Sequence, residues 1–245
     1  MSSAPRVAVV TGCSRSQGLG LEVCRQLAEQ GISLFLTARD PAKARALAEE
    51  LRGQGLDVHD HQLDISSDES VQAIVGLLEE RHGRLDILVN NATGSTPDAP
   101  PVSAVNLESA QRVVDVTLFG TWRLIQATLP LLRKSDAGRI VNVSSSAGLH
   151  GDPVWGLNSK IPVDPSYGIG KAALNALTAK LATELRETSI KINAVCPGFT
   201  ATSPRLAARG GRPVPEGAEG IVWAATLGED GPTGGFYRDR ELQAW

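Results

Sequence analysis

The sequence predicts a single α/β domain built on a doubly wound parallel sheet with helices on both faces. Short apolar runs rich in β-branched residues alternate with longer helical patterns throughout the 245 residues, as in repeated strand–helix units. Several of these runs are continuously apolar, which is typical of strands covered on both faces. No internal repeat or low-complexity linker interrupts the pattern, so one domain is expected over residues 1–245.

Strands and helices are expected in strict alternation. The predicted strands are Val7–Thr11, Ser33–Thr37, a short piece near Val58, Ile87–Val89, Ile140–Val143, Lys191–Val195 and a last one near Gly235–Arg238. The predicted helices are about Leu19–Gln30, Ala42–Arg52, Glu69–Arg81, Ser109–Arg133, Tyr167–Glu187 and Glu216–Leu227. Open α/β sheets bind ligands beyond the carboxyl ends of their strands. Loops at about 93–103, 148–164 and 199–215 are therefore expected to cover a substrate.

Composition and charge exclude several classes of function. The net charge of −3, from 24 basic and 27 acidic residues, gives no general reason to bind nucleic acid or an anionic membrane. No apolar run approaches the roughly 20 residues that span a bilayer, and no signal-peptide pattern precedes the first strand. Cys13, Cys24 and Cys196 match no metal or redox spacing and are expected to be reduced thiols of a cytoplasmic protein. His59 and His61 lack a third ligand at a suitable spacing, so no metal is expected.

A glycine-rich turn follows the first predicted strand. Such a turn lets backbone N–H groups approach a pyrophosphate at a helix N-terminus. Alone it also fits an ordinary turn, but the predicted strand before it and helix after it favour nucleotide binding. The candidate ligands here are Gly12, Ser14, Arg15, Gly18, Leu19 and Gly20.

The end of the second strand indicates which nucleotide is bound. An NAD site usually places a carboxylate there, whereas an NADP site places an arginine against the 2′-phosphate. Asp40 directly precedes Pro41, so we interpret it as a helix cap. Arg39 is then the expected phosphate ligand, with Arg15 as a second, and the alternative for Arg39 is a solvated surface arginine. The expected cofactor is NADP(H).

Later strands also end in polar or turn residues. Asp64 could accept a hydrogen bond from an adenine amino group, or it could be an ordinary turn aspartate. The remaining candidates for cofactor contact at these strand ends are Ile65, Asn91, Ala92, Pro197, Gly198, Thr200 and Thr202.

Three residues are candidates for the chemistry. Tyr167 and Lys171 lie four residues apart and share a helix face. A nearby ammonium favours the phenolate, so the pKa of Tyr167 is expected to be lowered and Tyr167 to donate protons near neutral pH. Ser145 follows a strand, where its hydroxyl could bind a substrate carbonyl. Each pattern alone is common.

In order, these motifs resemble the short-chain dehydrogenase/reductase family over essentially the whole chain. The set is Thr11-Gly12 with Gly18-x-Gly20, Asp64, Asn90-Asn91-Ala92, Ser145, Tyr167-x3-Lys171 and Pro197-Gly198. The segments Leu36–Asp40 and His61–Ile65 resemble its carbonyl reductase branch. The resemblance implies a Rossmann fold of strand order 3-2-1-4-5-6-7. It also implies Tyr167 as acid/base, Ser145 orienting the carbonyl, and Lys171 binding the nicotinamide ribose.

The sequence departs from the family pattern at three places. The glycine turn is two residues longer, which leaves open whether Ser14, Arg15 or Ser16 meets the phosphate. Thr93 stands where the family has glycine. Thr117 matches the fourth catalytic position, an asparagine in the family, and is expected to hold a relay water without copying the amide.

The expected activity is reduction of a ketone or aldehyde by NADPH, on a small-molecule substrate. The alternatives are alcohol oxidation, epimerisation or cyclisation at the same site, or a catalytically weak nucleotide-binding regulatory protein. An added loop between Ser145 and Tyr167 is expected to cover the substrate and leaves the choice of monomer or oligomer open. The residues expected to contact the substrate are Thr93, Ser145, Leu149, Trp155 and Phe199.

Overall fold

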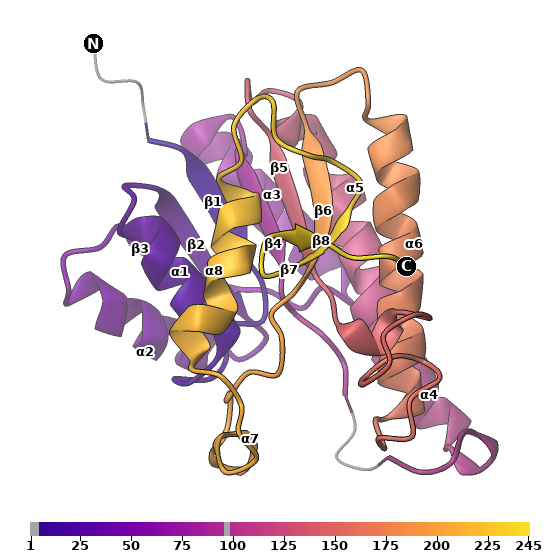
Figure 1. Ribbon diagram of the computed structural model, residues 1–245. Helices are drawn as coiled ribbons and strands as arrows, with labels where there is room; N and C mark the ends of the chain where they lie inside the picture. Colours follow the sequence, from indigo (N-terminus) through magenta and orange to yellow (C-terminus); the bar gives the residue numbers. More distant parts are fainter. Residues whose placement is uncertain (1–4, 96–98) are drawn as a thin grey trace.

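The computed structural model describes residues 5–95 and 99–245 and shows a twisted sheet between two layers of helices (Figure 1). Its strands are β1 (Val7–Val10), β2 (Ser33–Ala38), β3 (Val58–Gln62), β4 (Ile87–Asn90), β5 (Arg139–Val143), β6 (Lys191–Cys196), β7 (Phe236–Arg238) and β8 (Glu241–Leu242). Its α-helices are α1 (Leu19–Ala28), α2 (Pro41–Arg52), α3 (Asp68–His82), α4 (Leu107–Val114), α5 (Thr121–Leu132), α6 (Pro165–Glu184), α7 (Pro204–Ala207) and α8 (Val214–Ala225). Short 3₁₀ turns are η1 (Val102–Ala104) and η3 (Ser146–Gly148). Among the described helices, none is both long and apolar enough to cross a membrane.

The strands lie in the order β3-β2-β1-β4-β5-β6-β7-β8, and all neighbours are parallel except the last pair. The predicted order of the first seven strands is confirmed. Strand β8 was not predicted, and it forms a hairpin with β7. Asp239 and Arg240 make the two-residue turn with φ of 55° and 67°, a backbone that two-residue hairpin turns require.

The two faces of the sheet bury separate apolar clusters. Ala8 and Val10 of β1 point to one face, into a cluster with α1, α2 and α8, whereas Val7 and Val9 point to the other, into a cluster with α3, α5 and α6. Figure 1 shows α1, α2 and α8 in front of the strands and α3 and α5 behind them. Both faces are therefore covered, as the continuous apolar strands predicted.

The predicted helix Ser109–Arg133 is interrupted, so its prediction as one continuous helix was wrong. Between α4 and α5 the backbone widens into a π-helical turn, η2 (Asp115–Gly120). Such turns often occur at functional sites. Here the turn holds Thr117, which is fully buried and hydrogen-bonded to the loop after β4.

The helix caps mostly follow the sequence. Asp40 accepts hydrogen bonds from the backbone N–H of Ala42 and Lys43, which confirms it as the cap of α2. Asp164 caps α6 in the same way. Ser67 caps α3 by accepting from the N–H of Ser70, and the neighbouring Ser66 hydroxyl donates to Asp64.

Candidate active site

A cavity of about 740 Å³ opens at the carboxyl ends of β1, β2, β3 and β4. This is the edge where a doubly wound sheet binds its ligand. Most of the predicted cofactor residues line this cavity, together with the predicted substrate residue Thr93: Gly12, Ser14, Arg15, Gly18, Leu19, Gly20, Arg39, Asp64, Ile65, Asn91, Ala92 and Thr202.

Two glycines allow the walls of this cavity to come together. A Cβ on Gly12, whose φ is 75°, would lie 2.7 Å from Cα of Ala92, and a Cβ on Gly20 would lie 2.8 Å from Nδ2 of Asn91. Asn91 donates through that amide to the carbonyl of Thr11 at 2.7 Å. The hydroxyl of Thr11, a residue of the Thr11-Gly12 motif, accepts from the N–H groups of Asn91 and Ala92. The residues present thus form a bare backbone cradle that fits a dinucleotide pyrophosphate.

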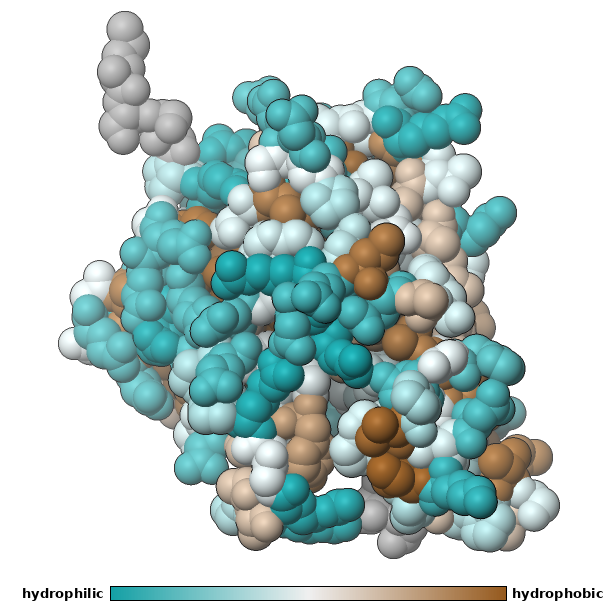
Figure 2. Space-filling view, viewed as in Figure 1, coloured by the Kyte–Doolittle hydropathy of each residue, from teal (hydrophilic) through white to brown (hydrophobic). Residues whose placement is uncertain are grey.

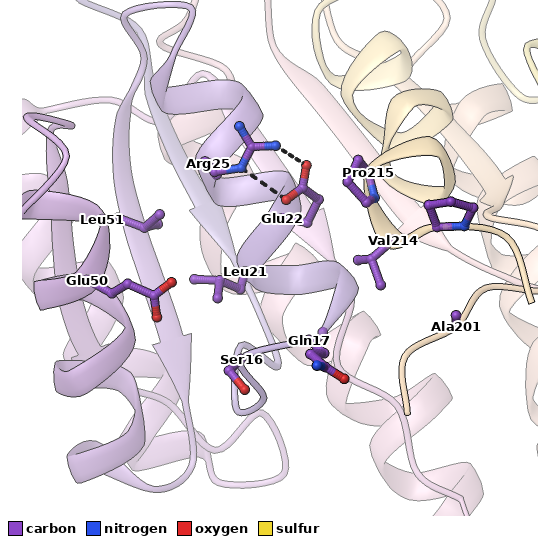
Figure 3. A pocket seen from close by; sticks show the side chains of 12 residues that line it. Ser16, Gln17, Leu21, Glu22, Arg25, Glu50, Leu51, Ala201, Val214 and Pro215 are labelled. Atoms are coloured by element: carbon purple, nitrogen blue, oxygen red, sulfur yellow. Dashed lines mark hydrogen bonds and ion pairs between the residues drawn. The ribbon is translucent and has the colours of Figure 1, made fainter. Parts of the chain in front are cut away.

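Residues of the glycine turn line two different cavities. Ser16 and Gln17 line a second cavity of about 420 Å³, beside α1 and the start of α8. Figure 3 shows both on the turn, near Leu21 of α1 and Val214 at the start of α8. Of the three residues left open by the sequence, Ser14 and Arg15 therefore face the cofactor cavity and Ser16 does not.

Three exposed cations surround the part of the cavity next to β2. Arg15, Arg39 and Lys43 all line it, while Asp40 is engaged by the helix it caps. Lys43 was missed, although its place in the first turn of the helix after β2 is visible in the sequence. Burial raises the pKa of Asp64, but hydrogen bonds from Ser66 and the charges of Arg39 and Arg123 bring the net pKa below its usual value. This cluster suits a doubly charged phosphate.

Of the predicted cofactor residues that follow β6, only some line this cavity. Thr202 lines it, whereas the Thr200 hydroxyl donates within its own turn, to the carbonyl of Pro197 at 2.9 Å. Gly198 has a φ of 70°, and its missing side chain makes room for the guanidinium of Arg212. Pro197, Gly198 and Thr200 thus shape a turn, and their contact with a cofactor stays a prediction.

Ser145, Tyr167 and Lys171 come together at the carboxyl end of β5. Ser145 caps the turn η3, where its side chain accepts from the N–H of Ala147, and it is hydrogen-bonded to Tyr167. The Lys171 amine lies 5.5 Å from the centre of the Tyr167 ring and donates to the carbonyl of Val143 at 2.6 Å. A Cβ on Gly148 would lie 2.5 Å from the backbone nitrogen of Ala172, so this glycine lets the turn pack directly on α6.

The expected lowering of the Tyr167 pKa is not what the site shows. Burial raises the pKa of Tyr167 to about 12, and the hydrogen bond from Ser145 only partly opposes it. Burial also lowers the pKa of Lys171 to about 7. Lys171 is 2% exposed, and desolvation disfavours both charged forms. The ammonium expected to stabilise the phenolate is therefore itself destabilised.

Thr117 does not present a free hydroxyl to the site. Its Oγ1 accepts a hydrogen bond from Gly94 N at 3.1 Å and lies 3.1 Å from Oγ1 of Thr93. It also packs on α6, where a Cβ on Gly170 would lie 3.4 Å from Thr117. Thr117 thus anchors the loop after β4, and its expected role of holding a relay water stays a prediction.

The predicted substrate loops meet through an aromatic pair. Trp155 of loop 148–164 stacks on Phe199 of loop 199–215, with ring centres 5.3 Å apart and planes at 20°. The exposed apolar side chains Val154 and Leu157 also belong to the first loop, and Figure 2 shows apolar surface over the segment between β5 and α6. Leu149 was wrongly placed on the substrate side, because it is buried in a small core cluster with Ala194, Cys196 and Phe236. Of loop 93–103, residues 96–98 lie outside the described part.

A polar network missed by the sequence analysis underlies these residues. Asn90 donates to Asn142, which donates to Thr178 on α6, and Ser144 donates to Asn175 at 2.5 Å. All of these side chains are buried. Asparagine and serine in otherwise apolar strands were the available signal, since buried polar groups require partners. The network ties β4 and β5 to the helix that carries Tyr167 and Lys171.

Comparison with known proteins assigns the family. The family model described as "short chain dehydrogenase" matches residues 6–209. The chain belongs to the short-chain dehydrogenase/reductase family. It is 34% identical to short-chain dehydrogenase/reductase 1 of Saponaria officinalis, over 97% of this chain and 95% of that protein. It is 33% identical to carbonyl reductase [NADPH] 3 of Rattus norvegicus, over the full length of both.

Solved structures agree with this assignment. The actinorhodin polyketide ketoreductase with NADPH superposes with a TM-score of 0.83 at 26% identity, covering 98% of this chain and 97% of that one. The resemblance to the family and to its carbonyl reductase members, drawn from the motifs, is thus confirmed.

Proposed function

We propose that this short-chain dehydrogenase/reductase reduces a ketone or aldehyde with NADPH. The observation that carries the proposal is the assembly of Ser145, Tyr167 and Lys171 at the same sheet edge as a cavity lined by Arg15 and Arg39. A serine, a phenol and an amine so placed can bind and protonate a carbonyl oxygen. The NADPH-linked relatives support the cofactor, and the two arginines and Lys43 support a 2′-phosphate.

Each residue has a defined task in this proposal. NADPH, when bound, supplies the hydride for the substrate carbon. The Ser145 hydroxyl donates a hydrogen bond to the carbonyl oxygen and so orients it. Tyr167 gives its hydroxyl proton to the same oxygen as negative charge develops there. Lys171, held by the Val143 carbonyl, lies against the Tyr167 ring and is placed to bind the nicotinamide ribose.

The protonation state of Tyr167 favours the reductive direction. With a pKa raised to about 12 by burial, the phenol is protonated at neutral pH and ready to donate. The oxidation of an alcohol would need the phenolate instead, which burial disfavours. The proposal therefore ranks reduction above alcohol oxidation. We further propose a cytoplasmic location, in keeping with the three free buried cysteines.

A titration and a turnover assay test the proposal together. Purified protein is titrated with NADPH and NADH, and NADPH oxidation is then followed across ketones, quinones and aldehydes. Preferential binding of NADPH with turnover supports the reductase. Tight binding without turnover on any carbonyl favours the regulatory alternative, and no binding of either nucleotide refutes the assignment.

A further inference from the structure

The C-terminal hairpin touches both loops that meet through the Trp155–Phe199 pair. Arg238 ends β7, Asp239 is the first turn residue, and the two side chains pair with different loops. Nη1 of Arg238 lies 2.9 Å from Oδ2 of Asp152 in loop 148–164. Both guanidinium Nη atoms of Arg212 in loop 199–215 bind the Asp239 carboxylate. Consecutive residues of one hairpin thus hold two separate loops.

The contact of Arg238 with Asp152 in loop 148–164 also involves the residue that follows Ser145. The Asp152 carboxylate is 5% exposed, and its Oδ1 accepts from the N–H groups of Val154 and Trp155 at 2.9 and 2.8 Å. Nη1 of Arg238 also donates to Oγ of Ser146, the residue after Ser145, at 3.1 Å. Asp152 therefore fixes the backbone that carries Trp155, and Arg238 fixes Asp152. A half-buried charge pair with this many partners orders its surroundings more than an exposed pair does.

The contact on loop 199–215 fixes the other half of the aromatic pair. The guanidinium of Arg212 lies over Gly198, where a Cβ would come within 2.8 Å of Cζ. The backbone of Arg212 also donates to the carbonyl of Phe199 at 2.8 Å. Asp239 thus fixes the side chain of Arg212, and the backbone of Arg212 fixes the part of loop 199–215 that carries Phe199.

We propose that the β7–β8 hairpin is a double latch, in which Arg238 and Asp239 are positioning residues that hold the Trp155–Phe199 lid over the substrate. Neither residue touches the reacting atoms. Their effect passes through Asp152 and Arg212 to the two loops, and so to substrate recognition. The structural part of this proposal stands alone, and its kinetic part rests on the proposed reductase function.

Limited proteolysis tests the Arg238–Asp152 and Asp239–Arg212 contacts separately. It does not depend on catalytic turnover. Trypsin has exposed sites at Lys160 in the first loop and at Arg205 and Arg209 in the second. Arg238→Met should speed cleavage after Lys160 and leave Arg205 and Arg209 unchanged. Asp239→Asn should do the reverse, and asparagine tolerates the left-handed φ at this position. Arg240→Met is the matched control, because Arg240 is the next residue and pairs only with exposed Glu219 among the described side chains.

The kinetic readout separates positioning from loss of fold. Arg238→Met should raise KM for a bulky ketone about fivefold to tenfold, a change worth roughly 1 to 1.4 kcal/mol, with kcat and NADPH affinity little changed. Arg238→Lys should restore part of the effect. Asp239→Asn should weaken NADPH as well, because Thr202 of the same loop lines the cofactor cavity.

The outcomes separate the two proposals. Cleavage rates at Lys160 that are equal in Arg238→Met and Arg240→Met would overturn the latch, as would uniform acceleration at all sites in either variant. Absence of carbonyl turnover with the predicted cleavage pattern would leave the latch supported and refute the proposed function.

Discussion

Oγ1 of Thr93 lies 3.1 Å from Oγ1 of Thr117, although the two residues are 24 positions apart. These are the two sites where the sequence departs from the family pattern around β4 and the helix after it. The two departures therefore form one contact. Thr117 also accepts from the N–H of Gly94, so the pair fastens the loop after β4 to the π-helical turn.

Removing the Thr117 hydroxyl should loosen this loop. Thr117→Val leaves the Gly94 N–H without its acceptor and removes one of the two partners of the Thr93 hydroxyl, so it should lower the free energy of unfolding by about 1–3 kcal/mol. Thr117→Ser keeps the hydroxyl and should lose less. Chemical denaturation of the three proteins measures both effects, and equal stability of the valine variant and the wild type would show that the contact is dispensable.

The contact between Thr93 and Thr117 also predicts that substitutions at the two positions have coupled effects on the free energy of unfolding. Thr117→Asn alone should destabilise the protein, because Thr117 is fully buried against Gly170 and Thr93. Combined with Thr93→Gly, which removes the opposing side chain, the asparagine should be tolerated better. A double-mutant cycle in unfolding free energy should give a coupling of about 0.5–3 kcal/mol. Additive effects would mean that the two sites act independently.

Burial of the Lys171 amine is expected to lower the free energy of unfolding, although the proposed reaction requires this residue. Its amine is 2% exposed and its pKa is lowered to about 7 by burial. Between about pH 7 and 10.5 the unfolded chain holds a proton that the folded protein has lost, so the free energy of unfolding should rise with pH in this range. Lys171→Met should abolish that rise and stabilise the nucleotide-free protein at pH 7 by about 1–2 kcal/mol, while abolishing turnover. Denaturation of both proteins across this pH range is the measurement, and parallel pH profiles would contradict it.

Nucleotide preference should depend on the cations beside β2. Arg39→Asp should weaken NADPH far more than NADH, because it removes a partner of the 2′-phosphate and adds a repelling charge. Lys43→Gln should act in the same direction but less, since Lys43 is an exposed point charge that also lies 3.9 Å from Asp40. Fluorescence titrations with both nucleotides measure this. Equal losses for NADPH and NADH would remove Arg39 from the phosphate site.

Much of the framework could be predicted from the sequence because it depends on local periodicity. The alternation of apolar strands and helices predicts a parallel sheet, and Asp40 before Pro41 predicts a helix cap that the structure confirms. The order of the first seven strands is what the family resemblance implied. Ser145, Tyr167 and Lys171 also meet as expected. The four-residue spacing places Tyr167 and Lys171 on one helix face, whereas their meeting with Ser145 is what the family resemblance implied.

The rest depends on contacts between distant segments. Leu149 was expected at the substrate because it lies in a loop, yet β6 and β7 bury it. The π-helical turn places Thr117 in contact with Thr93 and Gly94, and no helical periodicity encodes these contacts. The pKa of Tyr167 was expected to fall because its charged neighbour was visible in the sequence and its burial was not. The pairing of Arg238 with Asp152 is likewise invisible, since it joins residues 86 positions apart.

We propose that Tyr167 and NADPH together reduce a carbonyl group at this site. The most direct measurement uses NADPH deuterated at the transferable position of the nicotinamide, incubated with the carbonyl panel and wild-type protein or Tyr167→Phe. The wild type should give product alcohols with one deuterium on the carbinol carbon. Tyr167→Phe should lose about 10²–10⁴-fold in rate, with NADPH affinity retained. Product without deuterium, or undiminished turnover by Tyr167→Phe, would contradict it.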